Sequence, residues 1–208
     1  MADAARLFDG ERIVFAGDSV TDCGRRGGAG GGLGDGYVRM LAESAPFAGA
    51  SVINRGVGGD RAEDLARRWE ADVLAETPHC VSVMIGINDT WRRFDSGQET
   101  DQATFLARYR SMLERLAPDT PIILMEPFVL PVDAEQQKWR QDLDPRIASV
   151  RRLAKEFGAV LVRTDEILNN LVAAGTAPQT LAEDGVHPTE RGHAAIAAAW
   201  LDAVAGRP

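Results

Sequence analysis

Near the start of the chain stands the stretch Arg12-Ile13-Val14-Phe15-Ala16-Gly17-Asp18-Ser19, a short apolar run that ends in a polar turn. Four later runs share its apolar, β-branched character, at residues 51–54, 81–85, 121–125 and 159–162. Nearly continuous apolar character over so few residues is typical of strands that are buried on both faces of a parallel sheet. The pattern therefore predicts five buried strands.

Helical patterns separate these runs, at about residues 36–45, 61–75, 102–116, 145–157 and 189–204. In one of them the apolar residues recur at helical spacing: Leu143, Ile147, Val150, Leu153, Ala154 and Phe157. This spacing forms one apolar face on a helix. Strands that alternate with helices predict an α/β fold, a three-layer α/β/α sandwich around a five-stranded parallel sheet. We expect residues 1–208 to form one domain, since no linker or repeat interrupts the alternation.

The composition narrows the classes of function. Hydrophobic residues make up 45% of the 208 positions, which is enough for a sizeable core. The formal net charge of -8 argues against a nucleic-acid partner, because phosphate binding needs a positive surface. The segment Met1–Arg6 lacks the apolar run of a signal peptide, and the chain has no apolar stretch of about 18 residues. We expect a cytoplasmic protein without a membrane partner.

The sequence predicts neither a metal ion nor another cofactor. The two cysteines, Cys23 and Cys80, are too few for a structural zinc site without other ligands. Eight glycines within residues 24–36 give that segment the look of a phosphate-binding loop. It lacks the P-loop lysine, since the only lysines of the chain are Lys138 and Lys155. A nucleotide-binding domain is therefore disfavoured, and we interpret the segment as a loop near the mouth of the site.

Polar turns follow three of the predicted strands, and a fourth precedes the last predicted helix. They are Gly17-Asp18-Ser19, Gly56-Val57-Gly58-Gly59-Asp60, Gly86-Ile87-Asn88-Asp89 and Asp184-Gly185-Val186-His187-Pro188. In an open parallel sheet, the loops beyond the carboxyl ends of the strands form the active-site crevice. We therefore expect the four turns to converge at one edge of the sheet.

The residues in these turns have the chemistry of acyl transfer. A serine hydroxyl such as that of Ser19 becomes nucleophilic when a base takes its proton, and His187 is suited to be that base. Asp184, three residues earlier, can fix the tautomer of His187 and stabilise its protonated form. The backbone N–H groups of Ser19 and Gly59 and the side-chain amide of Asn88 are suitable donors to the developing oxyanion.

Each turn alone has a simpler interpretation. Gly-Asp-Ser and Gly-x-Asn-Asp both occur in ordinary turns and helix caps. His79 and His193 are interpreted as structural, because one precedes a predicted strand and the other lies on the last predicted helix. The joint occurrence of serine, glycine, asparagine and histidine turns, in order and at strand ends, favours a catalytic assembly.

The four turns resemble the four sequence blocks of the SGNH (GDSL-like) hydrolases, which are named for Ser, Gly, Asn and His. The resemblance extends over almost the whole chain and implies the flavodoxin-like SGNH hydrolase fold. It implies that Ser19 is the nucleophile and that His187 and Asp184 complete the triad. It also implies that Gly59 and Asn88 complete the oxyanion hole with Ser19.

Two features of the motifs qualify this resemblance. Gly56 and Gly58 compete with Gly59 for the second block, and Gly59 is chosen because Asp60 follows it. Residues 17–21 do not read G-x-S-x-G, which disfavours the α/β-hydrolase fold.

A narrower resemblance, to bacterial intracellular acetylxylan and xylo-oligosaccharide esterases of this group, rests on residues 19–24, 68–73 and 84–92. It implies hydrolysis of small acyl esters, above all acetyl esters of carbohydrates, through an acyl-enzyme. A lysophospholipase, thioesterase or aryl esterase is the alternative within the same chemistry. A non-catalytic binding module is the alternative outside it.

The expected partner is a small ester, and the side chains after the third predicted strand are candidates to bind it. Trp91 lies three residues beyond Asn88, so its ring is expected at the site mouth, either as a platform for a sugar or as packing for the loop. Arg55 and Arg92 are expected to donate hydrogen bonds to sugar oxygens or to pair with carboxylates. The sequence leaves open whether the chain forms a homo-oligomer.

Overall fold

One parallel sheet organises the molecule. The computed structural model describes Phe8, residues 10–27 and residues 31–206. Five strands pair in the order β2-β1-β3-β4-β5, every pair parallel. Their bounds are β1 (Arg12–Gly17), β2 (Ser51–Gly56), β3 (Cys80–Met84), β4 (Ile122–Met125) and β5 (Val160–Val162). The predicted strands are confirmed, with ends that shift by one or two residues.

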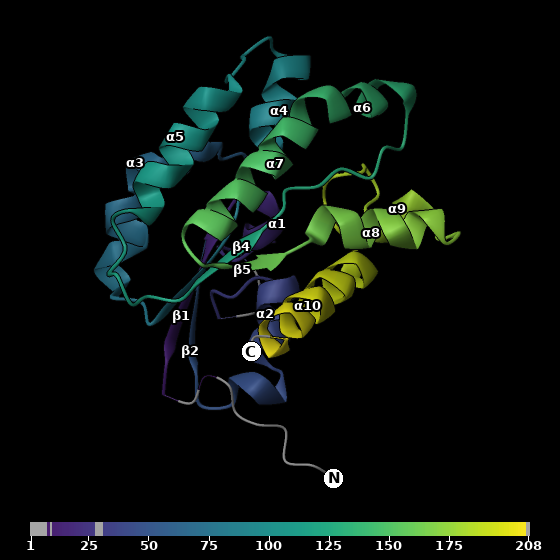
Figure 1. Ribbon diagram of the computed structural model, residues 1–208. Helices are drawn as coiled ribbons and strands as arrows, with labels where there is room; N and C mark the ends of the chain where they lie inside the picture. Colours follow the sequence, from purple (N-terminus) through teal and green to yellow (C-terminus); the bar gives the residue numbers. More distant parts are fainter. Residues whose placement is uncertain (1–7, 9, 28–30, 207–208) are drawn as a thin grey trace.

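Helices cover both faces of the sheet (Figure 1). One face carries α3 (Ala62–Asp72), α5 (Gln102–Leu113) and α7 (Arg140–Glu156). The other face carries α2 (Tyr37–Ala42), α8 (Thr164–Ala173) and α10 (Glu190–Ala205). The predicted three-layer α/β/α sandwich is therefore confirmed.

The two apolar layers explain why the strands are nearly continuous in apolar character. In β1, Ile13 and Phe15 belong to the core layer that contains Trp200 of α10. Val14 belongs to the opposite layer, which contains Trp69 of α3. Successive side chains of a strand point to opposite faces, so a strand covered on both sides needs an apolar residue at every position.

The helices differ from the prediction in two ways, since one starts earlier than predicted and others were not predicted at all. The helix predicted at 145–157 begins at Arg140, so Pro145 lies inside it. Leu143 is fully buried in a third apolar cluster with Trp139, and this burial extends the helix upstream. Five helices also form that were not predicted. They are α8 and the shorter helices α1 (Ser19–Asp22), α4 (Ile87–Asp95), α6 (Ala134–Lys138) and α9 (Pro178–Leu181). Two 3₁₀ turns, Ala45–Phe47 and Leu74–Glu76, complete the elements.

The described part of the glycine-rich segment contacts the end of α1 and strand β2. Residues 28–30 of this segment are outside the described residues. Asp35 donates its N–H to the carbonyl of Cys23, at 2.8 Å, and Asn54 of β2 donates to the carbonyl of Leu33, at 2.7 Å. These bonds hold both ends of the segment close to α1. Within the described part of the chain, no helix combines the length and apolar character needed to cross a membrane.

His193 of α10 is a buried core histidine that joins three elements. Its Nδ1 accepts the N–H of Tyr37 at 3.2 Å, so the ring proton lies on Nε2, which is 3.2 Å from the sulfur of Cys23. Burial, assisted by the charge of nearby His187, lowers the pKa of His193 from 6.5 to about 4. The ring is therefore neutral in the folded protein over most of the pH range.

The low pKa of His193 predicts a loss of stability in acid. The unfolded chain takes up a proton at this residue below about pH 6.5, but the folded protein does so only near pH 4, so stability falls as the pH drops through this window. His193→Asn keeps an acceptor for the Tyr37 N–H and cannot titrate. Between pH 7 and pH 4, the free energy of unfolding of the wild type should fall by about 3 kcal/mol more than that of the variant. Urea unfolding of both proteins at both pH values measures this difference. An equal fall in the free energy of unfolding for the wild type and the variant would contradict it.

Candidate active site

Ser19 stands at the carboxyl end of β1, where the strand turns directly into α1. Asp18 caps this helix by accepting the N–H of Val20 at 3.1 Å. The strand ends on Gly17, at which a Cβ would lie only 2.4 Å from the carbonyl oxygen of Met84. The absence of a side chain at position 17 therefore lets the serine turn pack directly against β3.

The structure brings Ser19, His187 and Asp184 together as a hydrogen-bonded chain. The hydroxyl of Ser19 is 2.9 Å from Nε2 of His187, and Nδ1 of His187 is 2.6 Å from Oδ2 of Asp184. An ionised carboxylate only accepts hydrogen bonds, so Nδ1 carries the ring proton and Nε2 is free to accept the proton of the serine. This is the tautomer that a general base requires.

The charge on Asp184 is stabilised locally. Burial alone would raise the pKa of Asp184, but hydrogen bonds from the backbone and ring of His187 and from the N–H of Val186 outweigh it and hold the pKa below its usual value. The two backbone bonds measure 2.7 and 3.0 Å. The side chains of His187 and Asp184 remain 48% and 46% exposed, so a substrate reaches the pair without any opening of the structure.

Gln136 of α6 holds the turn that carries Asp184 and His187. Its side-chain amide donates to the carbonyl of Asp184 at 2.6 Å, and the N–H of Leu130 donates to the carbonyl of Gly185 at 2.8 Å. Gly185 has a φ of +82°, and a Cβ there would lie 2.5 Å from the Gln136 oxygen. Sequence analysis missed Gln136, because the contact joins segments 48 residues apart and no local pattern marks it.

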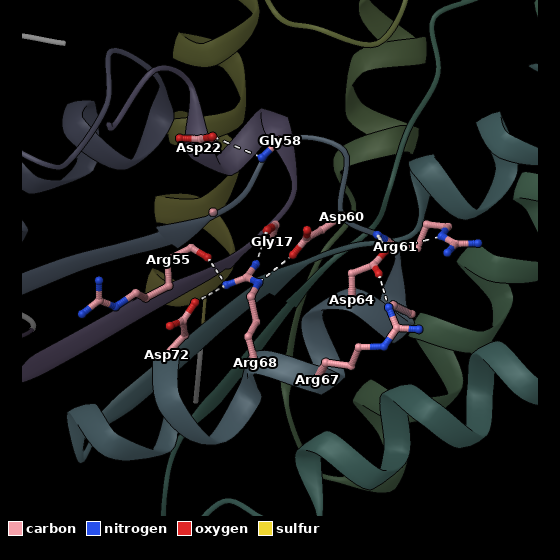
Figure 2. Close-up of polar contacts among 12 residues, drawn as sticks. Gly17, Asp22, Arg55, Gly58, Asp60, Arg61, Asp64, Arg67, Arg68 and Asp72 are labelled. Carbon is pink, nitrogen blue, oxygen red and sulfur yellow. Dashed lines mark hydrogen bonds and ion pairs between the residues drawn. The ribbon is translucent and has the colours of Figure 1, made fainter. Parts of the chain in front are cut away.

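Gly56, which ends β2, and Gly58 and Gly59, which follow it, lie in three different environments. A Cβ at Gly56 would lie 2.2 Å from the backbone nitrogen of Asp22, so this glycine allows close packing. The N–H of Gly58 is already bound to the carboxylate of Asp22, at 3.1 Å (Figure 2). Gly59 has a φ of +84°, is exposed, and would have no described heavy atom within 4 Å of a Cβ. Gly59 therefore has the most open surroundings of the three, and its role as an oxyanion donor stays a prediction.

Asn88 lies in the first turn of α4 and is 96% buried, since only 4% of its surface is exposed. Its amide nitrogen donates one hydrogen to the carbonyl of Asp60, at 3.1 Å. Asp60 follows Gly59, so this bond ties the asparagine to the glycine loop. The second hydrogen of the amide remains for another acceptor. The segment Gly86-Ile87-Asn88-Asp89, expected as a turn or a helix cap, is a cap, because α4 starts directly after Gly86, whose φ is +130°.

Two buried carboxyl groups lie behind the serine and the asparagine. Burial raises the pKa of Asp18 to about 7, although the Val20 N–H and the nearby His187 oppose this. Burial likewise raises the pKa of Asp89 to about 6, opposed first by the N–H of Ala62. Within the described residues, no group of three or more His, Cys, Asp or Glu side chains is placed to hold a metal ion.

Trp91 lies beside the candidate triad, as expected for a residue at the site mouth. Its ring centroid is 5.9 Å from that of His187 and 5.3 Å from that of Trp139. The ring is only partly buried, and it packs on the third apolar cluster together with Phe94. Trp91 therefore packs the loop, which is one of its two expected roles, and stays partly exposed next to His187, while its role as a sugar platform stays a prediction. Trp139 was missed, because its contact with Trp91 spans distant segments.

The structure does not bring Arg55 to this site. Its guanidinium pairs with Glu76, whose backbone carbonyl in turn accepts from Arg12 at the amino end of β1. The side chain extends away from Gly58 and Asp60 (Figure 2). Arg55 therefore has the second of its two expected roles, pairing with a carboxylate, and its binding of substrate stays a prediction. Arg92 pairs with Asp95 on the surface of α4, so its role in substrate binding stays a prediction.

A surface cavity of about 490 Å³ borders the candidate triad. It is lined by Glu183, Asp184, His187, Pro188, Thr189 and Glu190. Glu183 and Glu190 are exposed, so the rim beside His187 carries negative charge. Such a rim repels anionic molecules.

Comparisons with known proteins agree with this geometry. Residues 15–195 match the model of the GDSL-like lipase/acylhydrolase family. The chain is 37% identical to an acetylxylan esterase from Geobacillus stearothermophilus, over 94% of each chain. The crystal structure of an acetylxylan esterase from that organism matches with a TM-score of 0.85 and 36% identity, over 98% of this chain and 97% of that chain.

Two further sets of solved structures match. One comprises variants of that esterase described as catalytic mutants, in which a serine, a histidine or an aspartate is replaced by alanine. The other is an α/β hydrolase from the metagenome of Lake Arreo, Spain, with a TM-score of 0.83 and 31% identity, over 95% of this chain and 96% of that chain.

Proposed function

Since the chain belongs to the GDSL-like lipase/acylhydrolase family of carboxylic ester hydrolases, we propose that it removes acetyl groups from carbohydrates of the xylo-oligosaccharide class. The observation that carries the proposed chemistry is the chain of 2.9 Å and 2.6 Å contacts from Ser19 through His187 to Asp184. In this proposal Ser19 is the nucleophile, His187 the general base and Asp184 the residue that orients it.

In the first half of the reaction, Nε2 of His187 takes the hydroxyl proton while the oxygen of Ser19 attacks the acetyl carbonyl carbon. The carbonyl oxygen becomes an oxyanion, and the N–H groups of Ser19 and Gly59 and the amide of Asn88 donate to it. The tetrahedral intermediate collapses as the bond to the sugar oxygen breaks. His187 returns its proton to that oxygen, and the sugar alcohol leaves.

In the second half, water takes the place of the alcohol. His187 removes a proton from the water as it attacks the acetyl group on Ser19, and the same donors stabilise the second oxyanion. The bond to Ser19 then breaks, acetate leaves and the serine regains its proton from His187. The exposure of the His187 side chain supports this step, because water can approach the ring without a rearrangement of the chain.

The matched catalytic mutants support the assignment of residues. The replaced aspartate and histidine of that esterase are three residues apart, as are Asp184 and His187 here. The serine in its own mutant lies near the start of that chain, as Ser19 does in this one.

Two features support a neutral sugar as the substrate. The accessible face of Trp91 beside His187 offers an apolar surface for the C–H groups of a sugar ring. The negative rim formed by Glu183 and Glu190 disfavours substrates that carry phosphate, which include lysophospholipids and coenzyme A thioesters. A cytoplasmic location and a homo-oligomeric state stay predictions.

Ser19→Ala is expected to lower kcat for p-nitrophenyl acetate about a million-fold, because the nucleophile is lost. Circular dichroism and the melting temperature should remain those of the wild type. The control is Ser51→Ala, which removes an exposed hydroxyl at the start of β2 and should leave kcat unchanged. Substantial turnover by the pure Ser19→Ala protein would remove Ser19 from the role of nucleophile.

Trp91→Ala is expected to raise KM for acetylated xylo-oligosaccharides several-fold, because the sugar loses its aromatic platform. Hydrolysis of p-nitrophenyl acetate should change little, since this substrate has no sugar ring. Phe94→Ala is the matched control, because Phe94 stacks on the same Trp139 ring, whereas the ring contact with His187 is made by Trp91. A similar rise in KM for both variants would instead assign Trp91 to packing alone.

The acyl preference tests the substrate class directly. The rate on p-nitrophenyl esters should be greatest for acetate and fall by butyrate, because a small acyl pocket loses more to steric clash than it gains from added methylenes. Acetylated xylo-oligosaccharides should be deacetylated by the same preparation. Faster turnover of octanoate than of acetate would reject the acetylesterase and favour the lipase-like alternative.

A further inference from the structure

Arg68 of α3 contacts three segments, namely the end of β1, the end of β2 and the loop between β2 and α3 (Figure 2). Its side chain is only 17% exposed. The guanidinium donates through Nε to Asp60 at 2.6 Å, through one terminal nitrogen to the carbonyl of Arg55 at 2.7 Å, and through the other to the carbonyl of Gly17 at 2.9 Å. One planar group thus binds the carboxyl ends of β1 and β2 and the loop between β2 and α3.

The contact with Gly17 bears on the nucleophile. Gly17 is the last residue of β1, two positions before Ser19. Its carbonyl accepts both the Arg68 guanidinium and the N–H of Val57, at 3.0 Å, so the ends of β1 and β2 are held together at this point. Because the serine turn begins directly after this carbonyl, its position depends on the same pair of bonds.

The contact with Asp60 bears on the two other candidate oxyanion donors. Asp60 follows Gly59, and its backbone carbonyl accepts the amide of Asn88 at 3.1 Å. Burial raises the pKa of Asp60, and the bond from Arg68 is the leading influence that opposes this rise. Without the guanidinium, the carboxylate of Asp60 would lose its partner at a position where only 12% of the side chain is exposed, and the loop would move to solvate it.

From these contacts we propose that Arg68 is a positioning residue for the oxyanion hole, which sets the backbone of Ser19, the N–H of Gly59 and the amide of Asn88 relative to one another. This inference rests on the proposed function, because it assigns Arg68 an effect on that reaction. Arg68 itself touches no reacting atom. Its influence passes through Gly17 and Asp60.

The planar fork of arginine is needed for this role. Three acceptors in different segments are reached from one rigid group, whose nitrogens also pair with Asp72 at 2.9 Å. A lysine ammonium is a compact charge on a flexible stem and cannot reach both strand ends and Asp60 in fixed geometry. Arg68→Lys therefore keeps the charge but removes the fork.

The experiment compares Arg68→Ala and Arg68→Lys with Arg67→Ala on p-nitrophenyl acetate. Arg67 is the adjacent residue of the same helix, 67% exposed, and pairs with Asp64 on the surface (Figure 2). Arg68→Ala should lower kcat about 100-fold, the effect of misplacing a donor by about 1 Å, and change KM by less than about threefold. Arg68→Lys should lower kcat about 10-fold or more, while Arg67→Ala keeps the wild-type value.

Two readouts separate positioning from a general structural role. Millimolar guanidinium should restore part of the kcat of Arg68→Ala, because the small cation fills the vacated position, and should not raise that of Arg67→Ala. In a double-mutant cycle, Asn88→Ala alone should lower kcat about 100- to 1,000-fold. Adding Arg68→Ala to that variant should lower kcat much less than Arg68→Ala lowers it in the wild type, since the amide that Arg68 positions is already absent.

Three results would overturn the inference: kcat of Arg68→Ala within about threefold of the wild type, an equal loss in Arg67→Ala, or full multiplication of the two losses in the double variant. If Arg68→Ala does not fold, Arg68→Lys decides, and wild-type kcat at a wild-type melting temperature rejects the role. Ser19→Ala is measured in the same series. Activity in that variant rejects the proposed function, whereas an inactive Ser19→Ala with a fully active Arg68→Ala rejects only the inference on Arg68.

Discussion

The parallel pairing of β1 with β3 is the constraint on which the site depends. Gly17 and Met84 are partners in register, so both strands end at the same level of the sheet. Ser19 follows one end and Asn88 the other, and the two therefore start close to each other before any side-chain contact forms. The chain achieves this by adding β2 at one edge and returning across β1 to β3, which is the reversal of strand order at which α/β sheets place their crevices.

The charges around this crevice follow from its position in the fold. Asp18 and Asp89 lie behind it in a buried environment that favours their neutral forms at mildly acidic pH. Asp60 stays partnered by Arg68, and Asp184 is held ionised by His187 and two backbone N–H groups. Carboxyl groups of one residue type thus differ in ionisation because each has a different degree of burial and different donors.

Much of this arrangement could be predicted from the sequence. The strands were predictable because burial on both faces leaves mainly apolar residues in them, with exceptions such as Ser82 of β3 and Asn54 of β2. Ser19, Asp184 and His187 were singled out because each belongs to a polar turn at a predicted strand end or before the last helix, and the structure brings them within hydrogen-bond distance. These inferences use local patterns together with the geometry that all parallel sheets share.

What could not be predicted depends on partners that are distant in the sequence. Arg55 was expected at the substrate, but Glu76, 21 residues later, takes its guanidinium. Arg68 lies in the helix predicted at 61–75, where a charged residue is expected to face solvent, and its contacts with Gly17 and Asp60 become visible only when the strands are assembled. The residues Gly86 and Asn88 are common in both turns and helix caps, so their pattern alone does not show that α4 starts at Ile87.

The bonds from Arg68 to the strand ends, and from Asn88 to the carbonyl of Asp60, join groups of the chain itself and form as part of the fold. The conformational entropy of the loop from Val57 to Arg61 is therefore lost once, when the chain folds, and not again in every catalytic cycle. Part of the binding free energy of a substrate would otherwise be consumed in ordering this loop. In this fold it remains available for holding the ester in place against the serine.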